Sequence, residues 1–129
     1  MIPPDPSNPF ALFFALAIVH ALADFPLQGG YLARNKVRST ADGRGEWAVA
    51  LTAHSLIHAG GVWWVTGSIW LGLAELILHG MIDLAKGGGH FDFVTDQLLH
   101  LACKAIYVIL LAGPWAPSFL SSGFSISLP

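Results

Sequence analysis

The sequence predicts an all-α protein, in which four transmembrane helices form an up-down-up-down bundle. Two observations lead to this prediction. Hydrophobic residues make up 54% of the 129 residues and charged residues only 11%, whereas soluble domains carry about 25% charged residues. Four apolar stretches also follow one another along the chain, each close to the roughly 20 residues that a helix needs to cross a bilayer. Open strands cannot span lipid with unpaired edges, so these stretches are expected to be helices.

Glycines and prolines separate the four stretches within a single predicted domain, 1–129. The first follows a proline-rich leader and is expected to end at Gly29-Gly30. The third stops at a triple glycine, and the fourth stops before Gly113-Pro114. The start of the chain lacks the positive region of a signal peptide, so the first stretch is expected to remain as an anchor. The predicted helices cover about 9–27, 47–65, 68–85 and 93–111.

The positions of lysine and arginine predict the orientation in the membrane. Only two of the predicted connections are basic: the loop after the first helix and the turn that follows Lys86. The positive-inside rule places both in the cytoplasm and both termini outside. The tryptophans fit an aromatic belt, with Trp47 at the inner face and the others toward the outer face: Trp63, Trp64, Trp70 and Trp115. The cations of the first loop are Arg34, Lys36, Arg38 and Arg44.

Charge and cysteine content exclude some classes of protein. The net charge of −2 leaves no basic stripe to neutralise phosphates, so nucleic-acid binding is not expected. Cys103 is the single cysteine, so no disulfide can form within the chain. The expected partner is the lipid bilayer, and a homo-oligomer is not excluded.

Polar residues form a stripe on each predicted helix. Within a helix they are three or four residues apart, which places them on one face. The stripes lie toward the C-terminal ends of the first and third helices and in the N-terminal halves of the second and fourth. In an up-down-up-down bundle all four therefore meet at one end, the cytoplasmic one. Their members are His20, Asp24 and Gln28; His54 and His58; Glu75, His79, Asp83 and Lys86; Asp96, Gln97, His100 and Lys104.

The third and fourth helices allow a finer prediction. If they form an antiparallel hairpin, three pairs of polar residues lie at matching depths. Two carboxylates side by side repel one another unless they share a proton or bind a cation, and a cation is the simpler solution beside imidazoles. The deepest pair predicts a buried ion pair. From the turn inward, the pairs are Asp83/Asp96, His79/His100 and Glu75/Lys104.

Five imidazoles and three carboxylates exceed what one zinc ion needs, since a catalytic zinc takes three protein ligands. We therefore expect two or more divalent ions, with zinc favoured and iron or manganese as alternatives. His90 lies beside the triple glycine and is excluded. Residues around the ligands are Gln28, Gln97, Glu75 and Lys104. The candidate ligands are His20, Asp24, His54, His58, His79, Asp83, Asp96 and His100.

Other hypotheses fit parts of this pattern. Polar residues also hold membrane helices together, but four matching stripes exceed that need. Chains of histidine and aspartate also form proton or ion pathways, so a proton or metal-ion transporter or channel is an alternative. A di-iron oxidase would use similar ligands, although the sequence lacks the Glu-x-x-His motifs of di-iron carboxylate bundles.

The motifs resemble a family of small bacterial membrane proteins known as domain of unknown function 3307. The resemblance covers about Phe10 to Leu110 and implies a four-helix protein of the bacterial inner membrane. It rests on His20-Ala-Leu-Ala-Asp24-Phe-Pro-Leu-Gln28, Lys36, His54/His58, His79-x-x-x-Asp83-x-x-Lys86 and Asp96-Gln97-x-x-His100.

The repeated His-x-x-x-Asp also resembles predicted membrane-bound metal-dependent hydrolases. This favours a hydrolase acting on a lipid or other membrane-associated ester or phosphoester. Water activated by the metal would be the nucleophile, and Asp96 the general base. Lys86 and Lys36 would hold an anionic substrate and steady its developing negative charge.

Overall fold

The computed structural model describes residues 8–114 and 116–121, which form six helices. The four long ones, α1, α3, α4 and α5, begin and end within three residues of the predicted bounds. Two short helices, α2 and α6, were not predicted. The helices are α1 (Pro9–Asp24), α2 (Gly29–Asn35), α3 (Glu46–Thr66), α4 (Ile69–Gly87), α5 (Phe93–Ala112) and α6 (Ser118–Ser121).

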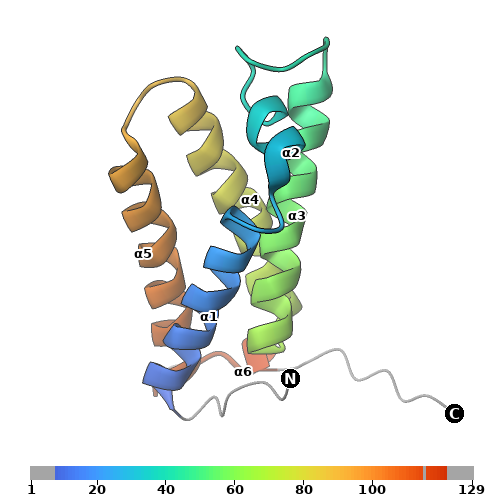
Figure 1. Cartoon of the computed structure of the whole chain (residues 1–129). Helices are drawn as coiled ribbons and strands as arrows, with labels where there is room; N and C mark the ends of the chain where they lie inside the picture. The colour runs from blue at the N-terminus through green and yellow to red at the C-terminus, as the bar shows by residue number, and fades with distance from the viewer. Residues whose placement is uncertain (1–7, 115, 122–129) are drawn as a thin grey trace, which may run out of the picture.

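The four long helices run alternately up and down as a bundle (Figure 1). α3 packs against α1 and α4, and α5 packs against the same two helices, so the bundle is roughly square in section. The α3–α4 connection is tight because Gly67 adopts a φ of 69°, a left-handed conformation that glycine adopts without strain. Gly61 lets α1 approach α3: a Cβ there would lie 2.1 Å from Cγ1 of Val19.

The first predicted helix is three residues too long. α1 ends at Asp24, because Pro26 has no N–H to continue the hydrogen-bond ladder. The N–H of Leu27 instead bonds to the carbonyl of Leu22 at 3.0 Å, five residues back. Gly29, with a φ of 58°, then begins α2, whose axis is bent by 85° from that of α1. Gly29-Gly30 therefore begins a helix and does not end one.

Hydrogen bonds join the short helix α2 to the loop that follows it. The buried Asn35 side chain donates to the Asp42 carboxylate at 3.3 Å and to the carbonyl of Tyr31 at 3.2 Å. Its amide oxygen accepts from the N–H of Asp42 at 2.7 Å. This clamp fixes the start of the loop that follows α2, and with it the position of Lys36.

The interiors of the two halves of the bundle differ in polarity. Toward α6, the interior is an ordinary apolar core. Toward α2, the large fully buried side chains include histidines, carboxylates and a lysine, which are treated below. The apolar core consists of Leu12, Leu16, Val62, Val65, Leu71, Tyr107, Val108 and Leu120.

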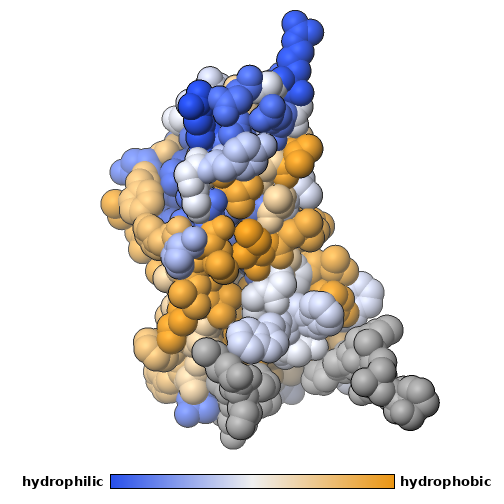
Figure 2. Space-filling view, turned by 45° about the vertical axis from the view of Figure 1, so that its right-hand side comes forward, coloured by the Kyte–Doolittle hydropathy of each residue, from blue (hydrophilic) through white to orange (hydrophobic). Residues whose placement is uncertain are grey.

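The outer surface of the bundle is apolar around the long helices. Figure 2 shows hydrophobic residues over the middle of the molecule and hydrophilic ones concentrated at the α2 end. Within the described residues, α5 is the one helix that alone has the length and apolar composition to cross a membrane. α1 and α2 meet the same criteria of length and apolar composition only when they are counted together as one bent span. Of the predicted aromatic belt, Trp47 lies at the start of α3 and three tryptophans flank the α3–α4 turn, whereas Trp115 lies outside the described residues.

Candidate metal centre

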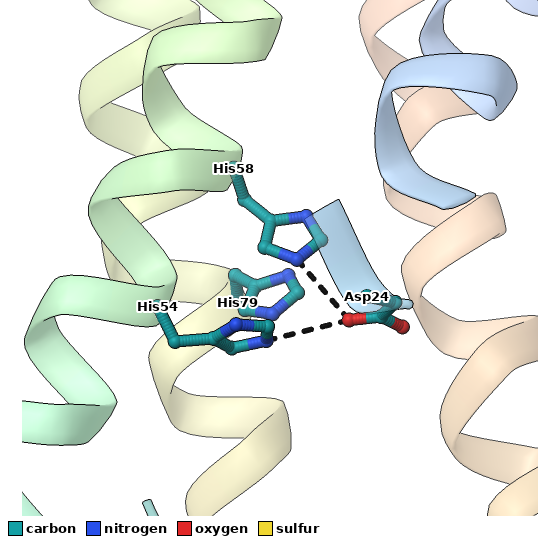
Figure 3. A group of neighbouring side chains, drawn as sticks. All are labelled: Asp24, His54, His58 and His79. Atoms are coloured by element: carbon teal, nitrogen blue, oxygen red, sulfur yellow. Dashed lines mark hydrogen bonds and ion pairs between the residues drawn. The ribbon is translucent and has the colours of Figure 1, made fainter. Parts of the chain in front are cut away.

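Asp24, the last residue of α1, lies at the meeting point of three histidines. Its Oδ1 is 3.1 Å from Nε2 of His58 and 3.3 Å from Nε2 of His54. Its Oδ2 is 3.4 Å from Nε2 of His20, one turn back on α1. Figure 3 shows the two imidazoles of α3 pointing toward the same carboxylate oxygen, with His79 of α4 between them in the view.

These residues form a first group able to hold a metal ion. Asp24, His54, His58 and His79 each offer one ligand atom, and all four atoms lie within 4.8 Å of one another. Two ligands bound to zinc at 2.0–2.2 Å in a tetrahedron lie roughly 3.3–3.6 Å apart. The Asp24 separations of 3.1 and 3.3 Å are close to that spacing. The three histidines are almost fully buried.

A second group lies beside the first and shares a residue with it. Its members are His79, Asp83 and His100, and their ligand atoms also lie within 4.8 Å of one another. His79 stacks between His58 and His100, with ring centroids 3.6 and 4.1 Å away. The predicted His79/His100 pair is therefore confirmed. Each of the two groups, which meet at His79, could hold a metal ion.

Several buried imidazole nitrogens have no hydrogen-bond partner within the described part of the chain. Leaving a buried polar atom unpaired costs about 1–3 kcal/mol, so such an accumulation calls for a ligand. A cation bound in the cluster would use ring nitrogens of His79 and His100, whereas His20 and His54 face Asp24 with Nε2 and not with the unpaired Nδ1. The unpaired atoms are Nδ1 of His20, Nδ1 of His54, and both ring nitrogens of His79 and of His100.

Two lysines neutralise the carboxylate pair Asp83/Asp96 at the α2 end of the bundle, which is called the mouth of the site. Lys36 Nζ lies 2.7 Å from Oδ2 of Asp83, and Lys86 Nζ lies 2.8 Å from Oδ2 of Asp96. Both aspartates approach Nε2 of His100, at 3.4 and 3.5 Å, so they lie at the predicted common depth. The sequence predicted that a metal ion neutralises this pair, but here each carboxylate has an ammonium partner.

Lys36 also reaches a metal-ligand candidate directly, because its Nζ lies 3.0 Å from Nε2 of His54. His54 Nε2 and Asp83 Oδ2 are themselves 3.4 Å apart. The ammonium group thus contacts the same two atoms that a divalent cation would contact in this position.

The predicted Glu75–Lys104 ion pair is confirmed, and both side chains are 1% exposed. The Tyr107 hydroxyl donates to Oε2 of Glu75 at 2.9 Å. Oε1 of Glu75 lies 3.3 Å from Nδ1 of His79, so this carboxylate orients the histidine that the two groups share. Tyr107 was missed, although it continues the α5 stripe three residues after Lys104.

The two glutamines differ in their contacts. The Gln97 amide donates to Oδ2 of Asp24 at 2.8 Å and to Oδ2 of Asp96 at 3.2 Å, and its Oε1 lies 3.3 Å from Nε2 of His20. Gln97 therefore supports the candidate ligands directly. Gln28 lines the cavity at the mouth of the site, and its Oε1 has no hydrogen-bond partner within the described residues.

A cavity of about 400 Å³ opens onto the cluster at the α2 end. Its lining includes the three aspartates and the lysines Lys36 and Lys86, together with the apolar Phe25 and Phe93. A second cavity, of about 480 Å³, lies on the other side of the Lys36–Val37 segment and reaches Asp83 as well. His90, which sequence analysis excluded, is exposed and bonds to the carbonyl of Ala85.

The fold and the site define a small helical-bundle protein with a buried histidine–aspartate cluster that could hold metal ions. A family model described as "Protein of unknown function (DUF3307)" matches residues 12–122, so the chain belongs to this family. No curated protein and no solved structure shows a significant match to the chain.

Proposed function

We propose that the protein is a membrane-embedded, metal-dependent hydrolase that cleaves an ester or phosphoester at the membrane surface. The observation that carries this proposal is the pair of histidine–aspartate groups that share His79 beside an open cavity. A purely structural cluster would be closed and internally paired. This one has unpaired donors and a route for substrate.

The distribution of apolar residues supports a location in the membrane. Large apolar side chains are usually buried in soluble proteins and charged ones exposed, whereas this bundle exposes many large apolar side chains and buries Glu75, Asp96 and Lys104. Along α1, large apolar side chains face outward at every fourth position, and the other long helices show similar faces. The polar residues that lower the overall hydropathy of α3 and α4 face the interior. The outward residues of α1 are Phe10, Phe14, Ile18 and Leu22.

The orientation proposed from the basic loops puts the metal centre on the cytoplasmic side of the bacterial inner membrane. Five of the six lysine and arginine residues belong to α2, to the loop after it, or to the end of α4. All five therefore lie at the mouth end of the bundle. Trp63, Trp64 and Trp70 are each about half exposed and would mark the opposite interface between membrane and water.

Two divalent ions, with zinc favoured over manganese or iron, fit the donors. Bound there, the metal would acidify water and polarise the ester group. Asp96 belongs to neither ligand group, and its buried Oδ1 has no hydrogen-bond partner within the described residues. Asp96 is therefore placed to accept the proton of the attacking water. A metal on Asp83 would release Lys36 to stabilise negative charge on the substrate.

A transport pathway is less well supported, because the polar column ends inside the bundle. Beyond Glu75 and Lys104 the interior is filled by Leu12, Leu16 and Val62, which are 1–2% exposed. A transported ion would have to cross this packed apolar layer. A site that opens at the α2 end is suited to binding and releasing substrate from the same side.

Elemental analysis of the detergent-purified protein tests the metal directly. We expect the wild type to retain zinc or manganese at one or more ions per chain, and His54→Ala/His58→Ala to lose it. His90→Ala is the matched control, because His90 is exposed and outside the cluster. If the wild type stays as empty as the double variant after metal is supplied, the hydrolase proposal is wrong.

The Asp96→Asn variant separates catalysis from metal binding. Asn keeps the shape of the side chain but cannot act as the base. We expect normal metal content with hydrolysis reduced by roughly 100-fold or more, within the range of general acid–base contributions. Loss of metal together with activity would make Asp96 a ligand instead.

A further inference from the structure

The cavity at the mouth of the site has both charged and aromatic lining residues, a combination that suits an amphiphilic molecule. The cavity beside α1 and α5 has carboxylates and lysines in its lining. Phe25 and Phe93 also line it and are 62% and 55% exposed, and the Lys86 ammonium lies 4.8 Å from the centroid of the Phe93 ring. A soluble polar substrate would gain nothing from these two rings, whereas a hydrocarbon chain would cover them.

The balance of charge in the cluster favours an anionic substrate. Four carboxylates and three ammonium groups leave one net negative charge when the histidines are neutral: Asp24, Glu75, Asp83 and Asp96 against Lys36, Lys86 and Lys104. Two divalent cations would turn this into three net positive charges. Buried net charge is costly, so the loaded site needs an anion, which a neutral carboxylic ester does not provide.

The two mouth lysines are placed to receive that anion. Their ammonium groups hold Asp83 and Asp96, on α4 and α5, and both line the same cavity. A metal ion that binds Asp83 would take over the neutralising role of Lys36 there. Lys36, released from Asp83, and Lys86, which stays beside Asp96, both line this cavity and would offer ammonium donors to phosphate oxygens.

We propose that the substrate is a phosphate ester of a lipid, with its phosphate between Lys36 and Lys86 and its chain against Phe25 and Phe93. This inference rests on the proposed hydrolase function and names its substrate class. In the reaction, the oxygen of water forms a bond to phosphorus and the bond from phosphorus to the ester oxygen breaks. The leaving oxygen takes up the proton that the water released, so the products are a lipid alcohol and inorganic phosphate.

Three probes distinguish the possible ligands of zinc-loaded protein in phosphatidylcholine nanodiscs. They are phosphatidic acid, which has phosphate and chains, diacylglycerol, which has chains only, and glycerol phosphate, which has phosphate only. We expect phosphatidic acid to bind at least about tenfold more tightly than either of the others, a difference of about 1.4 kcal/mol. Equal binding of diacylglycerol, or preference for glycerol phosphate, would overturn the proposal.

Variants test whether the phosphate of the ligand lies against the lysines and its chain against the phenylalanines. Phe25→Ala is expected to weaken binding of phosphatidic acid several-fold without changing that of glycerol phosphate. Phe10→Ala, which removes an exposed ring at the far end of α1, is the matched control. Lys86→Gln is expected to weaken both phosphate ligands and to leave diacylglycerol unchanged. If Phe25→Ala and Phe10→Ala behave alike, the chain does not lie in this cavity.

Phosphate release in the same samples keeps the two proposals apart. Selective, metal-dependent binding of phosphatidic acid without release of phosphate would contradict the hydrolase and leave the ligand class standing. Release of product from a neutral ester, with no preference for phosphatidic acid, would support a hydrolase and reject the lipid phosphate.

Discussion

The α2 half and the α6 half of the bundle are made from the same four helices but have opposite interiors. In the α6 half, leucines and valines fill the space, as in an ordinary core. In the α2 half, histidines and carboxylates from all four helices fill it, and ion pairs replace apolar contacts. We expect the α6 half to contribute mainly to stability and the α2 half to bind the proposed metal ions. Substitutions that affect only one of these properties test that separation.

The largest effect is expected at the boundary between the halves. Lys104→Met removes the partner of the fully buried Glu75. Breaking a buried ion pair by removing one partner costs about 3–5 kcal/mol. Thermal unfolding in detergent should show this loss, and the double variant Lys104→Met/Glu75→Gln should recover most of it. An unchanged single variant would mean that the two halves do not depend on this pair.

The second largest effect is expected in the apolar half, where a substitution should change stability and not metal content. Leu16→Ala opens a cavity in the core and should lower the free energy of unfolding by about 2–5 kcal/mol. Metal content should stay at the wild-type level, because Leu16 lies in the apolar core cluster and not among the ligand groups. Loss of metal from this folded variant would contradict the separation of the two halves.

The polar half should show the reverse behaviour on a smaller scale. Gln97→Ala removes hydrogen bonds to two candidate ligands, Asp24 and His20. Such supporting contacts are worth about 10–100-fold in metal affinity, measurable by competition with a chelator. Gln28→Ala, which alters the cavity wall without touching a ligand, should leave the affinity unchanged. Equal effects of the two substitutions would show that Gln97 does not support the ligands.

The smallest effect is expected outside both halves. Arg34 and Asp42 form an ion pair at 2.6 Å, but both side chains are about half exposed or more. Exposed pairs contribute about 0–1 kcal/mol, so Arg34→Gln should leave both unfolding and metal content nearly unchanged. A larger loss would mean that the α2 clamp depends on this pair as well as on Asn35.

Sequence periodicity predicted the stripes and the hairpin pairs because helix geometry alone determines which residues share a face and a depth. His79/His100 and Glu75/Lys104 could be found in this way. Sequence periodicity could not predict the 85° turn after Pro26, since a proline ends a helix without fixing the direction of the next one. Lys36 was therefore expected near the membrane surface, whereas α2 and its clamp bring it to Asp83 and His54.

The shortness of α1 has a consequence for the surrounding bilayer. Its 16 residues span about 24 Å and the 21 residues of α3 about 32 Å, at 1.5 Å per residue. In a membrane of ordinary thickness, headgroups would dip toward Asp24 to match the shorter hydrophobic length. The hydrolysis that we propose should then be fastest in thin bilayers, where the dip costs least, and should slow as acyl chains lengthen.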